Sequence, residues 1–339
     1  MRALYLYVAV LAACRAPDAD PAAADAATVD VDAPANLPDF CNATDPRGTA
    51  VEIVATPEAG EAPYVTALTA AHTSIDVMIY EMGYGGILDT LKAKASAGVA
   101  VRVLLDLSEK AVNQKYYDQL AAAGAQVKWS DPKFTYQHAK FFVADHQVAV
   151  MSTGNYSKTY SIDLERNFVA TDRDPADVLD LVNLFAADWA NVDPVMTCTR
   201  MVISPINARS RVIDVINSAT ETLTIESMQF ADSAVRAAVA QRVQAGVNIR
   251  VIMADTGFVS ANASAATYLK NLGLAPRYIP HMHTKVIVAD GARAYVGSEN
   301  LSQTSLDHNR EVGVVVTDPS SIDPLVTTFE SDWTLGTAF

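Results

Sequence analysis

The stretch HAKFFVAD at residues 138–145 recurs as HTKVIVAD at residues 283–290. In both copies a Lys follows the His by two positions, an Asp by seven and an Asn by seventeen, at Asn155 and Asn300. The apolar run between Lys and Asp predicts a buried strand, on which positions i and i+2 face the same side. Each copy is therefore expected to present an imidazole and an ammonium group next to each other.

Further segments repeat at nearly the same displacement, 144 to 149 residues along the chain. The paired segments are Ser74–Tyr80 with Thr222–Met228, Ala97–Asp106 with Ala245–Asp255, and Phe185–Trp189 with Phe329–Trp333. Strand-like and helical patterns alternate in each half, which is typical of a layered α/β domain. We therefore predict two tandem α-β-α sandwich repeats, residues 50–195 and 196–339. A pseudo-two-fold axis is expected to relate them, so that elements occurring once per half meet at that axis.

The doubled pattern resembles the HxKxxxxD signature of the phospholipase D superfamily, whose trailing Gly-Ser-x-Asn is present in the second copy at residues 297–300. The resemblance covers roughly residues 50 to 339. Two complete copies at matching offsets make it far more specific than a lone short motif. It implies an α/β fold with one active site where the two repeats meet, acting on a phosphodiester with no metal ion and no cofactor.

A phosphodiester that exchanges one alkoxide for another nucleophile needs positioning and stabilisation of the charge on its oxygens. Lys140 and Lys285 are expected to supply cationic donors for that charge. The residues expected to bind or support the phosphate are Asn155, Asn300, Thr153, Ser298 and Glu311. One neutral His attacks phosphorus to form a phosphohistidine, and the other, protonated, donates to the leaving oxygen.

The roles of the two His depend on the groups that hold their rings. Glu311 lies 28 residues after His283, where single-motif relatives carry a Glu bonded to their His, and the aligned residue in the first half is Asn167. A carboxylate favours imidazolium and an amide does not. We therefore predict that His283 is the general acid and His138 the nucleophile, which the resemblance also favours. Glu165 remains an alternative carboxylate partner in the first half.

Asp145 and Asp290 complete the two motifs and count among the candidate catalytic residues. The resemblance implies a structural role for them, in keeping with their position at the end of a buried strand beside a turn. His281, two positions before His283, suggests a metal pair. No third ligand has suitable spacing and the neighbouring Lys285 would repel a cation, so we predict that no metal is bound.

The composition narrows the choice of substrate. The chain has 339 residues with a net charge of −14, and half of its residues are apolar, which suits one or two globular domains. The acidic balance argues against bulk electrostatic binding of nucleic acid. Phospholipid is the favoured substrate, hydrolysed to phosphatidic acid and a head-group alcohol, with transfer to another alcohol as a further outcome. A nonspecific endonuclease, a cardiolipin-synthase-like phosphatidyltransferase and a non-catalytic envelope lipoprotein that binds phosphate ligands remain alternatives.

The N-terminus has the outline of a secretory signal. One cation, Arg2, precedes an apolar run that is too short to span a bilayer and ends at Cys14. Leu11-Ala12-Ala13-Cys14 resembles a bacterial lipobox, which implies a signal peptide over residues 1–14 and lipidation of Cys14. We therefore expect an exported protein of the cell envelope, which a lipid anchor holds at the outer membrane or on the periplasmic face.

The residues after Cys14 point to a tether and a cysteine pair. Residues 15–39 consist mostly of Ala, Asp and Pro, and we expect them to form a disordered tether. Cys41 and Cys198 form an even pair, which in an exported protein indicates either a disulfide or two buried free thiols. Because both motifs lie in one chain, we expect a monomer.

Overall fold

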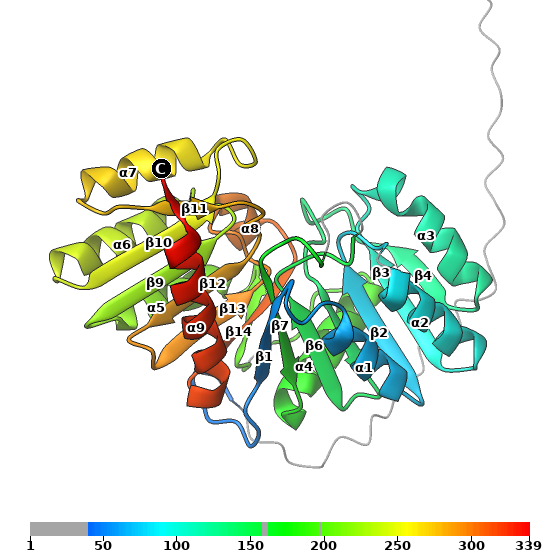
Figure 1. Ribbon diagram of the computed structural model, residues 1–339. Coiled ribbons are helices and arrows are strands. Elements are labelled where there is room, and N and C mark those ends of the chain that lie inside the picture. Colours follow the sequence, from blue (N-terminus) through cyan, green and yellow to red (C-terminus); the bar gives the residue numbers. More distant parts are fainter. Residues whose placement is uncertain (1–39, 84, 158–161, 197) are drawn as a thin grey trace, which may run out of the picture. The chain divides into compact units, whose positions relative to one another are not determined.

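The computed structural model describes residues 40–83, 85–157, 162–196 and 198–339. Cys14, the lipobox-like segment and the expected tether over residues 15–39 lie outside the described residues. Two mixed sheets, each with helices on both faces, organise the described part of the chain (Figure 1). None of the helices in these ranges is both long and apolar enough to cross a bilayer.

The first repeat builds one sheet, with strand order β1-β7-β6-β5-β2-β3-β4. Its elements are β1 (Glu52–Thr56), α1 (Ala62–Ala70), β2 (Ser74–Ile79), α2 (Gly85–Ser96), β3 (Ala100–Leu105), α3 (Lys110–Ala122), β4 (Gln126–Trp129), β5 (Phe141–Ala144), β6 (Val148–Ser152), β7 (Asn167–Asp172) and α4 (Pro175–Trp189). Strands β2, β3 and β4 are parallel, and β5 runs antiparallel to β2.

The second repeat builds the other sheet, with strand order β15-β11-β10-β9-β12-β13-β14-β8. Its elements are β8 (Met201–Ser204), α5 (Ala208–Ser218), β9 (Thr222–Ser227), α6 (Ser233–Gln244), β10 (Asn248–Ala254), α7 (Asn262–Asn271), β11 (Arg277–Ile279), β12 (Lys285–Ala289), β13 (Arg293–Gly297), α8 (Gln303–Asp307), β14 (Glu311–Val316), α9 (Pro319–Leu335) and β15 (Thr337–Ala338). Taken from β8 inward, this order matches that of the first sheet from β1. The predicted fold class, two tandem α-β-α repeats, is confirmed.

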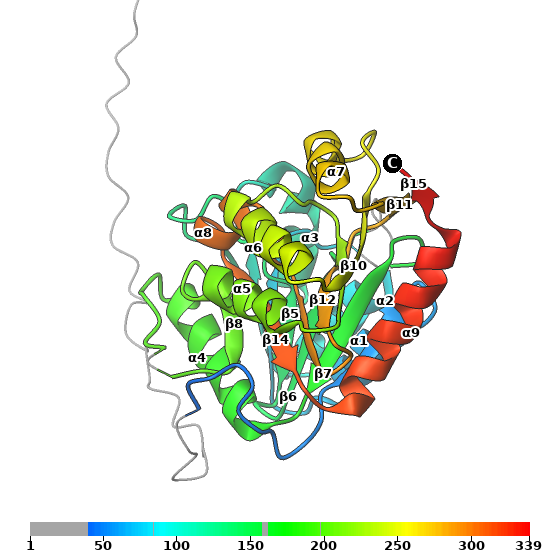
Figure 2. The same cartoon turned by 90° about the vertical axis from the view of Figure 1, so that its left-hand side faces the viewer.

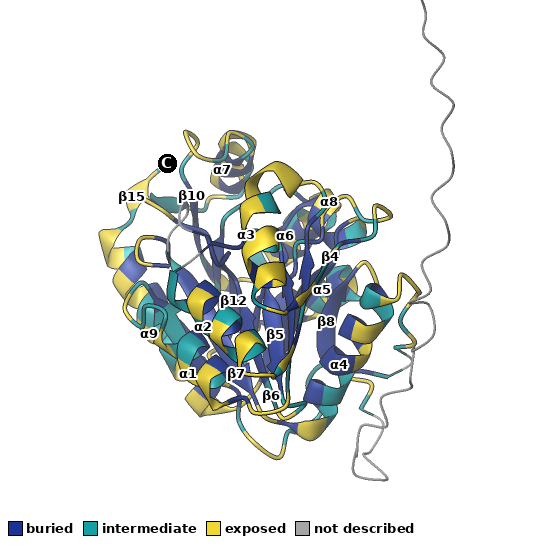
Figure 3. Ribbon diagram, turned by 90° about the vertical axis from the view of Figure 1, so that its right-hand side faces the viewer, coloured by how far each residue is buried: buried dark blue, intermediate teal, exposed yellow. Residues whose placement is uncertain are grey.

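Helices cover both faces of each sheet because each helix has an apolar side to bury. Helices α5 and α6 lie together on one face of the second sheet, and α9 lies on the other face (Figure 2). In the first repeat, α1, α2 and α3 turn exposed sides outward while the strands beneath them are buried (Figure 3). Each repeat thus has its own apolar core. The matching ends of α4 and α9 also contribute to contacts between the repeats.

Backbone bridges and buried ion pairs join the two repeats. Gln137 forms a parallel bridge with Arg310, and Arg166 forms the equivalent bridge with Met282. The Arg310 guanidinium donates to Asp188 at the end of α4 through Nε at 2.7 Å and Nη2 at 3.0 Å. Its counterpart Arg166 donates in the same way to Asp332 on α9. These reciprocal contacts bring the start of each motif strand against the other repeat.

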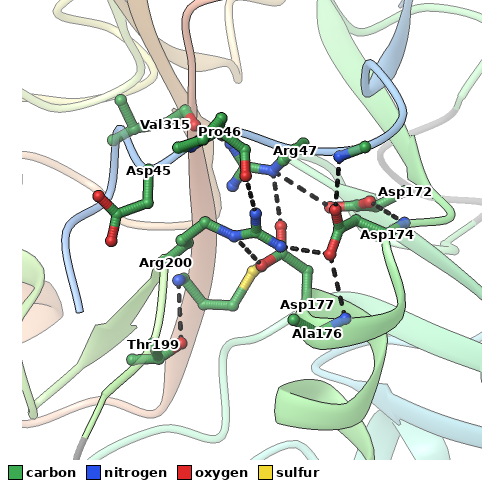
Figure 4. Close-up of polar contacts among 12 residues, drawn as sticks. Asp45, Pro46, Arg47, Asp172, Asp174, Ala176, Asp177, Thr199, Arg200 and Val315 are labelled. Carbon is green, nitrogen blue, oxygen red and sulfur yellow. Dashed lines mark hydrogen bonds and ion pairs between the residues drawn. The ribbon is translucent and has the colours of Figure 1, made fainter. Parts of the chain in front are cut away.

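A segment before β1 ties the end of the first repeat to the second (Figure 4). Arg47 donates through Nε to Asp177 on α4 at 2.6 Å and through Nη1 to the carbonyl oxygen of Val315 at 2.8 Å. Arg200 donates to Asp177 as well, at 2.8 Å. Nearby, Cys41 and Cys198 are joined in a disulfide, one of the two alternatives that the sequence left open.

Candidate active site

The two motifs begin at equivalent ends of the strands in the two sheets. Lys140 immediately precedes β5 and Lys285 opens β12, and each of these strands runs antiparallel to the neighbouring β2 or β9. The His and Lys of each motif therefore stand at the carboxyl ends of the parallel strands, which is where ligands bind in open α/β sheets. Both Lys side chains are almost completely buried.

The ring of His138 is held by a carboxylate from the other repeat. Its Nδ1 lies 2.8 Å and 2.9 Å from the two oxygens of Glu311. We predicted Glu311 as the partner of His283, and that pairing is wrong. The reason is the bridge between the repeats: the backbone N–H of His138 donates to the carbonyl oxygen of Arg310 at 2.8 Å, which brings the next residue, Glu311, beside this ring.

Glu311 is fully buried and is fixed by donors from its own repeat. It accepts hydrogen bonds from Ser298 Oγ at 2.6 Å, Ser305 Oγ at 2.6 Å and Asn309 Nδ2 at 3.0 Å. Burial alone would raise its pKa, but His138, Lys140 and Asn309 outweigh burial and hold the pKa at about 2. Because an ionised carboxylate can only accept, Nδ1 of His138 carries a hydrogen and Nε2 keeps its lone pair.

The ring of His283 is held by an amide instead. Its Nδ1 lies 3.0 Å from Oδ1 of Asn167, which also accepts a hydrogen bond from Thr153 Oγ1 at 2.8 Å. Thr153 thus supports Asn167 as Ser298 supports Glu311. Glu165, the alternative carboxylate, lies farther away, with its Oε2 3.8 Å from Nδ1. Both hydroxyls that we predicted as phosphate-supporting groups are therefore engaged with the side chains that hold the two His.

The two motif Lys residues place two ammonium groups in a buried site. Lys285 Nζ donates to the carbonyl oxygens of Thr153, at 3.0 Å, and of His283, while Lys140 Nζ donates to the carbonyl oxygen of His138. Burial lowers the pKa of Lys140 to about 8, and burial together with the charge of Lys140 lowers the pKa of Lys285 to about 7. An anion bound between the two ammonium groups would stabilise their charged forms and raise both pKa values.

Burial and the two cations also keep both imidazoles neutral. Burial lowers the pKa of His138 to about 4, against the opposing effect of Glu311. Burial lowers the pKa of His283 well below its ordinary value, and Lys285 and Lys140 lower it further. Each His feels the Lys of the other repeat, so the motifs contribute to one electrostatic environment. A negatively charged phosphate would favour protonation of either ring.

Asp145 and Asp290 lie at the far end of the motif strands and hold backbone there. Asp145 accepts hydrogen bonds from the backbone N–H groups of Thr73, at 2.7 Å, and Ser74, at 2.9 Å. Asp290 accepts from Glu221 and Thr222 in the same way, each at 2.8 Å. At about 3.3 Å per strand residue, five positions separate each Asp from its Lys by about 16 Å. We counted both Asp residues among the candidate catalytic residues, but these contacts give them a structural role.

The two Asn residues of the motifs follow β6 and β13 closely. The side-chain amide oxygens of Asn155 and Asn300 are buried and have no hydrogen-bond partner among the described residues. Their part in binding phosphate stays a prediction. Within the same residues, no group of three or more His, Cys, Asp or Glu side chains is arranged to hold a metal ion.

Tyr80 is a site residue that the sequence reasoning missed. Its ring packs edge-on against His138, with centroids 4.7 Å apart, and lies 5.3 Å from Lys140 Nζ. Its hydroxyl donates to Glu109 at 2.8 Å. The available signal was its position: Tyr80 directly follows β2, at the edge of the sheet where the motif begins. The aligned residue of the second repeat is Met228, so this position carries an aromatic ring in the first repeat and a thioether in the second.

Comparison with known proteins agrees with the fold and the doubled site. The family described as "Cardiolipin synthase, PLD-like domain" matches residues 64–189 and 212–333. "Probable cardiolipin synthase YwiE" of Bacillus subtilis is 23% identical over 288 residues, covering 73% of this chain and 58% of that protein. "Cardiolipin synthase" of Clostridium perfringens is 25% identical over 284 residues, covering 68% of this chain and 58% of its own length. The chain therefore spans little more than half the length of these relatives.

A solved structure extends the agreement to the whole fold. The phosphatidylserine synthase of Haemophilus influenzae superposes with a TM-score of 0.69 at 14% identity, covering 90% of this chain and 89% of that one. At this identity the likeness concerns the fold alone. Together with the family match over both repeats, it leads to one conclusion: the chain belongs to the phospholipase D superfamily, with one PLD-like domain in each repeat.

Proposed function

We propose that this protein is a phosphatidyltransferase that moves a phosphatidyl group from one phospholipid to the hydroxyl group of another, in the manner of a cardiolipin synthase. From the sequence alone we favoured hydrolysis of phospholipids. The relatives named cardiolipin synthases, and the family description that shares this name, support transfer over hydrolysis. Water in place of the acceptor alcohol would give phosphatidic acid from the same intermediate.

The observation that carries the proposal is the crossed support of the two motif His residues. His138 hydrogen-bonds to Glu311 of the other repeat, and His283 to Asn167 of the other repeat. Each Nδ1 is thereby occupied, so each Nε2 is the nitrogen left for chemistry. The two Lys ammonium groups lie beside these rings and supply positive charge for a phosphate bound between them.

In the first step, Nε2 of His138 attacks phosphorus and forms an N–P bond while the bond from phosphorus to the head-group oxygen breaks. His283, protonated once the phosphate anion is bound, gives its Nε2 proton to that oxygen, and the head-group alcohol leaves. We assign the nucleophile to His138 because ionised Glu311 fixes its Nδ1–H tautomer. This reason replaces the one based on imidazolium stabilisation by Glu311 at His283.

In the second step, neutral His283 takes a proton from the hydroxyl group of the acceptor phospholipid. The acceptor oxygen attacks phosphorus, the N–P bond breaks, and His138 is released in its starting form. His283 then holds the proton that the next leaving group needs. Protons and charges therefore balance over the cycle, and the chemical steps are carried by side chains of this chain.

An assay of the purified protein on phosphatidylglycerol vesicles in EDTA tests the proposal. We expect cardiolipin and free glycerol as products, and loss of both in His138→Ala. Phosphatidic acid without cardiolipin would overturn transfer in favour of hydrolysis. Cleavage of plasmid DNA without any change in lipid would overturn the lipid substrate and establish the nuclease alternative.

We propose a membrane-anchored, exported location for this activity. The Cys41–Cys198 disulfide supports export, since disulfides persist in oxidising compartments. Lipidation of Cys14 remains an inference from the lipobox-like sequence. Metabolic labelling with a tritiated fatty acid should mark the wild-type protein and leave Cys14→Ser unlabelled. Equal labelling of both proteins would refute the anchor.

A further inference from the structure

Asn167 breaks the symmetry of the two repeats at the point where the His rings are held. It opens β7 as Glu311 opens β14, but it offers an amide where the second repeat offers a carboxylate. Thr153 Oγ1 accepts the backbone N–H of Phe168 at 3.0 Å, so its own hydrogen goes to Asn167 Oδ1. The oxygen of the amide therefore faces His283, and its NH2 group faces away from that ring.

The NH2 group of Asn167 faces Glu165. Nδ2 of Asn167 lies 3.4 Å from Oε2 of Glu165, a side chain in a residue that is only 3% exposed. Gly154 makes room for this arrangement, since a Cβ at that position would come within 2.5 Å of the same Nδ2. A series of contacts thus runs from Glu165 through the Asn167 amide to the His283 ring. Oε2 of Glu165 lies 3.8 Å from Nδ1 of His283.

The charges around His283 explain why a carboxylate is needed in this place. Lys285 Nζ lies 3.3 Å from Nδ1, and the charges of Lys285 and Lys140 both disfavour a positive charge on His283. Glu165 is the carboxylate that pairs with His283 in the described part of the chain. Glu165 itself faces Lys285, Lys140 and Glu81. Protonation of His283 is thus disfavoured by two neighbouring cations and favoured by one carboxylate.

We propose that Glu165 is a positioning residue that acts on His283 through the Asn167 amide and stabilises its protonated form during departure of the head group. The proposal rests on the proposed function, in which His283 is the general acid. Glu165 takes up no proton in the step: the proton leaves Nε2 for the head-group oxygen, while Nδ1–H remains bonded to Asn167. Glu165, two residues before Asn167, thereby supplies the negative charge that Asn167 lacks.

Glu165→Gln tests this role, because it removes the charge while keeping the shape. Burial raises the pKa of Glu165 to about 7, so its charge is present above that pH and lost below it. We expect kcat on phosphatidylglycerol vesicles to fall about 10- to 100-fold at pH 8, as for other buried supporting groups, and only about twofold at pH 6. KM should stay within about twofold. A loss that is equal at both pH values, or no loss at pH 8, would overturn the proposal.

A rescue variant separates charge from packing. Asn167→Asp places a carboxylate of the same shape directly against Nδ1 of His283 and still accepts from Thr153. Added to Glu165→Gln, it should restore kcat at pH 8 to within about fivefold of wild type. A folded double variant that remains as slow as Glu165→Gln would show that the position, and not the charge, matters, and the proposal would fall.

A measurement without lipid distinguishes failure of this inference from failure of the proposed function. NMR titration of His283 in the full chain with 15N-labelled His and saturating inorganic phosphate reports its protonation directly. Glu165→Gln should lower the pKa of His283 by about one unit, since a negative neighbour is removed. Identical titration in the two proteins would overturn the role of Glu165. Absence of phosphatidyl transfer, with the shift present, would overturn the proposed function alone.

Discussion

Glu311→Gln is the substitution that most directly tests how the nucleophile is prepared. Both oxygens of Glu311 are surrounded by donors: Ser305 and Asn309 donate to Oε1, Ser298 donates to Oε2, and His138 reaches both. Ser298 Oγ also accepts the backbone N–H of Val312 at 3.1 Å, so its hydrogen is committed to the carboxylate. A carboxamide would turn its NH2 group toward one of these donors in either orientation.

The size of the effect follows from what the substitution removes. A hydrogen bond to a charged group contributes about 1.5–3 kcal/mol, and 1.4 kcal/mol is about tenfold in rate, so loss of charge assistance alone predicts up to about 150-fold. If the NH2 group faces His138, Nδ1 must become an acceptor and the hydrogen moves to Nε2, the nitrogen that attacks. Loss of the correct tautomer costs about 10⁴-fold in a comparable His–carboxylate pair. We therefore expect kcat/KM to fall by about 10²- to 10⁴-fold.

The assay is conversion of phosphatidylglycerol vesicles at pH 7 in EDTA, beside urea unfolding to show that the variant is folded. Glu299→Gln is the matched control: burial raises the pKa of Glu299 to about 8, so this fully buried residue is mostly protonated at pH 7. The same substitution then removes little charge, and we expect activity within about threefold of wild type. A folded Glu311→Gln protein that loses less than tenfold would refute the argument that Glu311 sets the tautomer of His138.

Three further outcomes concern stability. Burial holds the pKa of Lys285 at about 7 against its ordinary 10.5, so the unfolded chain binds more protons between these values and stability rises with pH there. Lys285→Met should remove about 1.4 kcal/mol of that rise per pH unit, measured by urea unfolding at pH 8 and pH 9. Asp188→Asn should cost about 3–5 kcal/mol, since it leaves buried Arg310 with a neutral partner, and an effect below 1 kcal/mol would contradict this. Reduction of Cys41–Cys198 should lower the free energy of unfolding by about 2–5 kcal/mol, measured by urea unfolding with and without dithiothreitol, and unchanged midpoints would contradict it.

The fold was predictable because the information for it is periodic and local. Buried strands such as Phe141–Ala144 and Lys285–Ala289 are apolar throughout, and their repetition at one displacement revealed the duplication. The meeting of the two motifs followed from duplication and two-fold packing, without knowledge of any contact. Strand order within each sheet was not predicted, since separations along the chain do not determine which strands become neighbours.

The partners of the two His could not be predicted because they depend on which repeat supplies them. Distance along the chain placed Glu311 with His283, and only the bridge between Gln137 and Arg310 shows that it belongs to His138. Tyr80 escaped notice for a related reason: an aromatic residue after a buried strand is usually core, and its contact with His138 depends on how β2 and β5 pair. Local patterns predict elements, whereas contacts across the axis need the assembled sheets.

Two copies of a motif in one chain can have different surroundings, whereas two identical subunits give both copies the same surroundings. In the proposed chemistry, one imidazole needs a free lone pair and the other needs a proton to donate. Two identical surroundings would give both rings the same affinity for that proton. In this chain His138 has an ionised carboxylate in direct contact, while His283 has an amide with a carboxylate behind it. Unequal surroundings separate the tasks of two rings that come from the same motif.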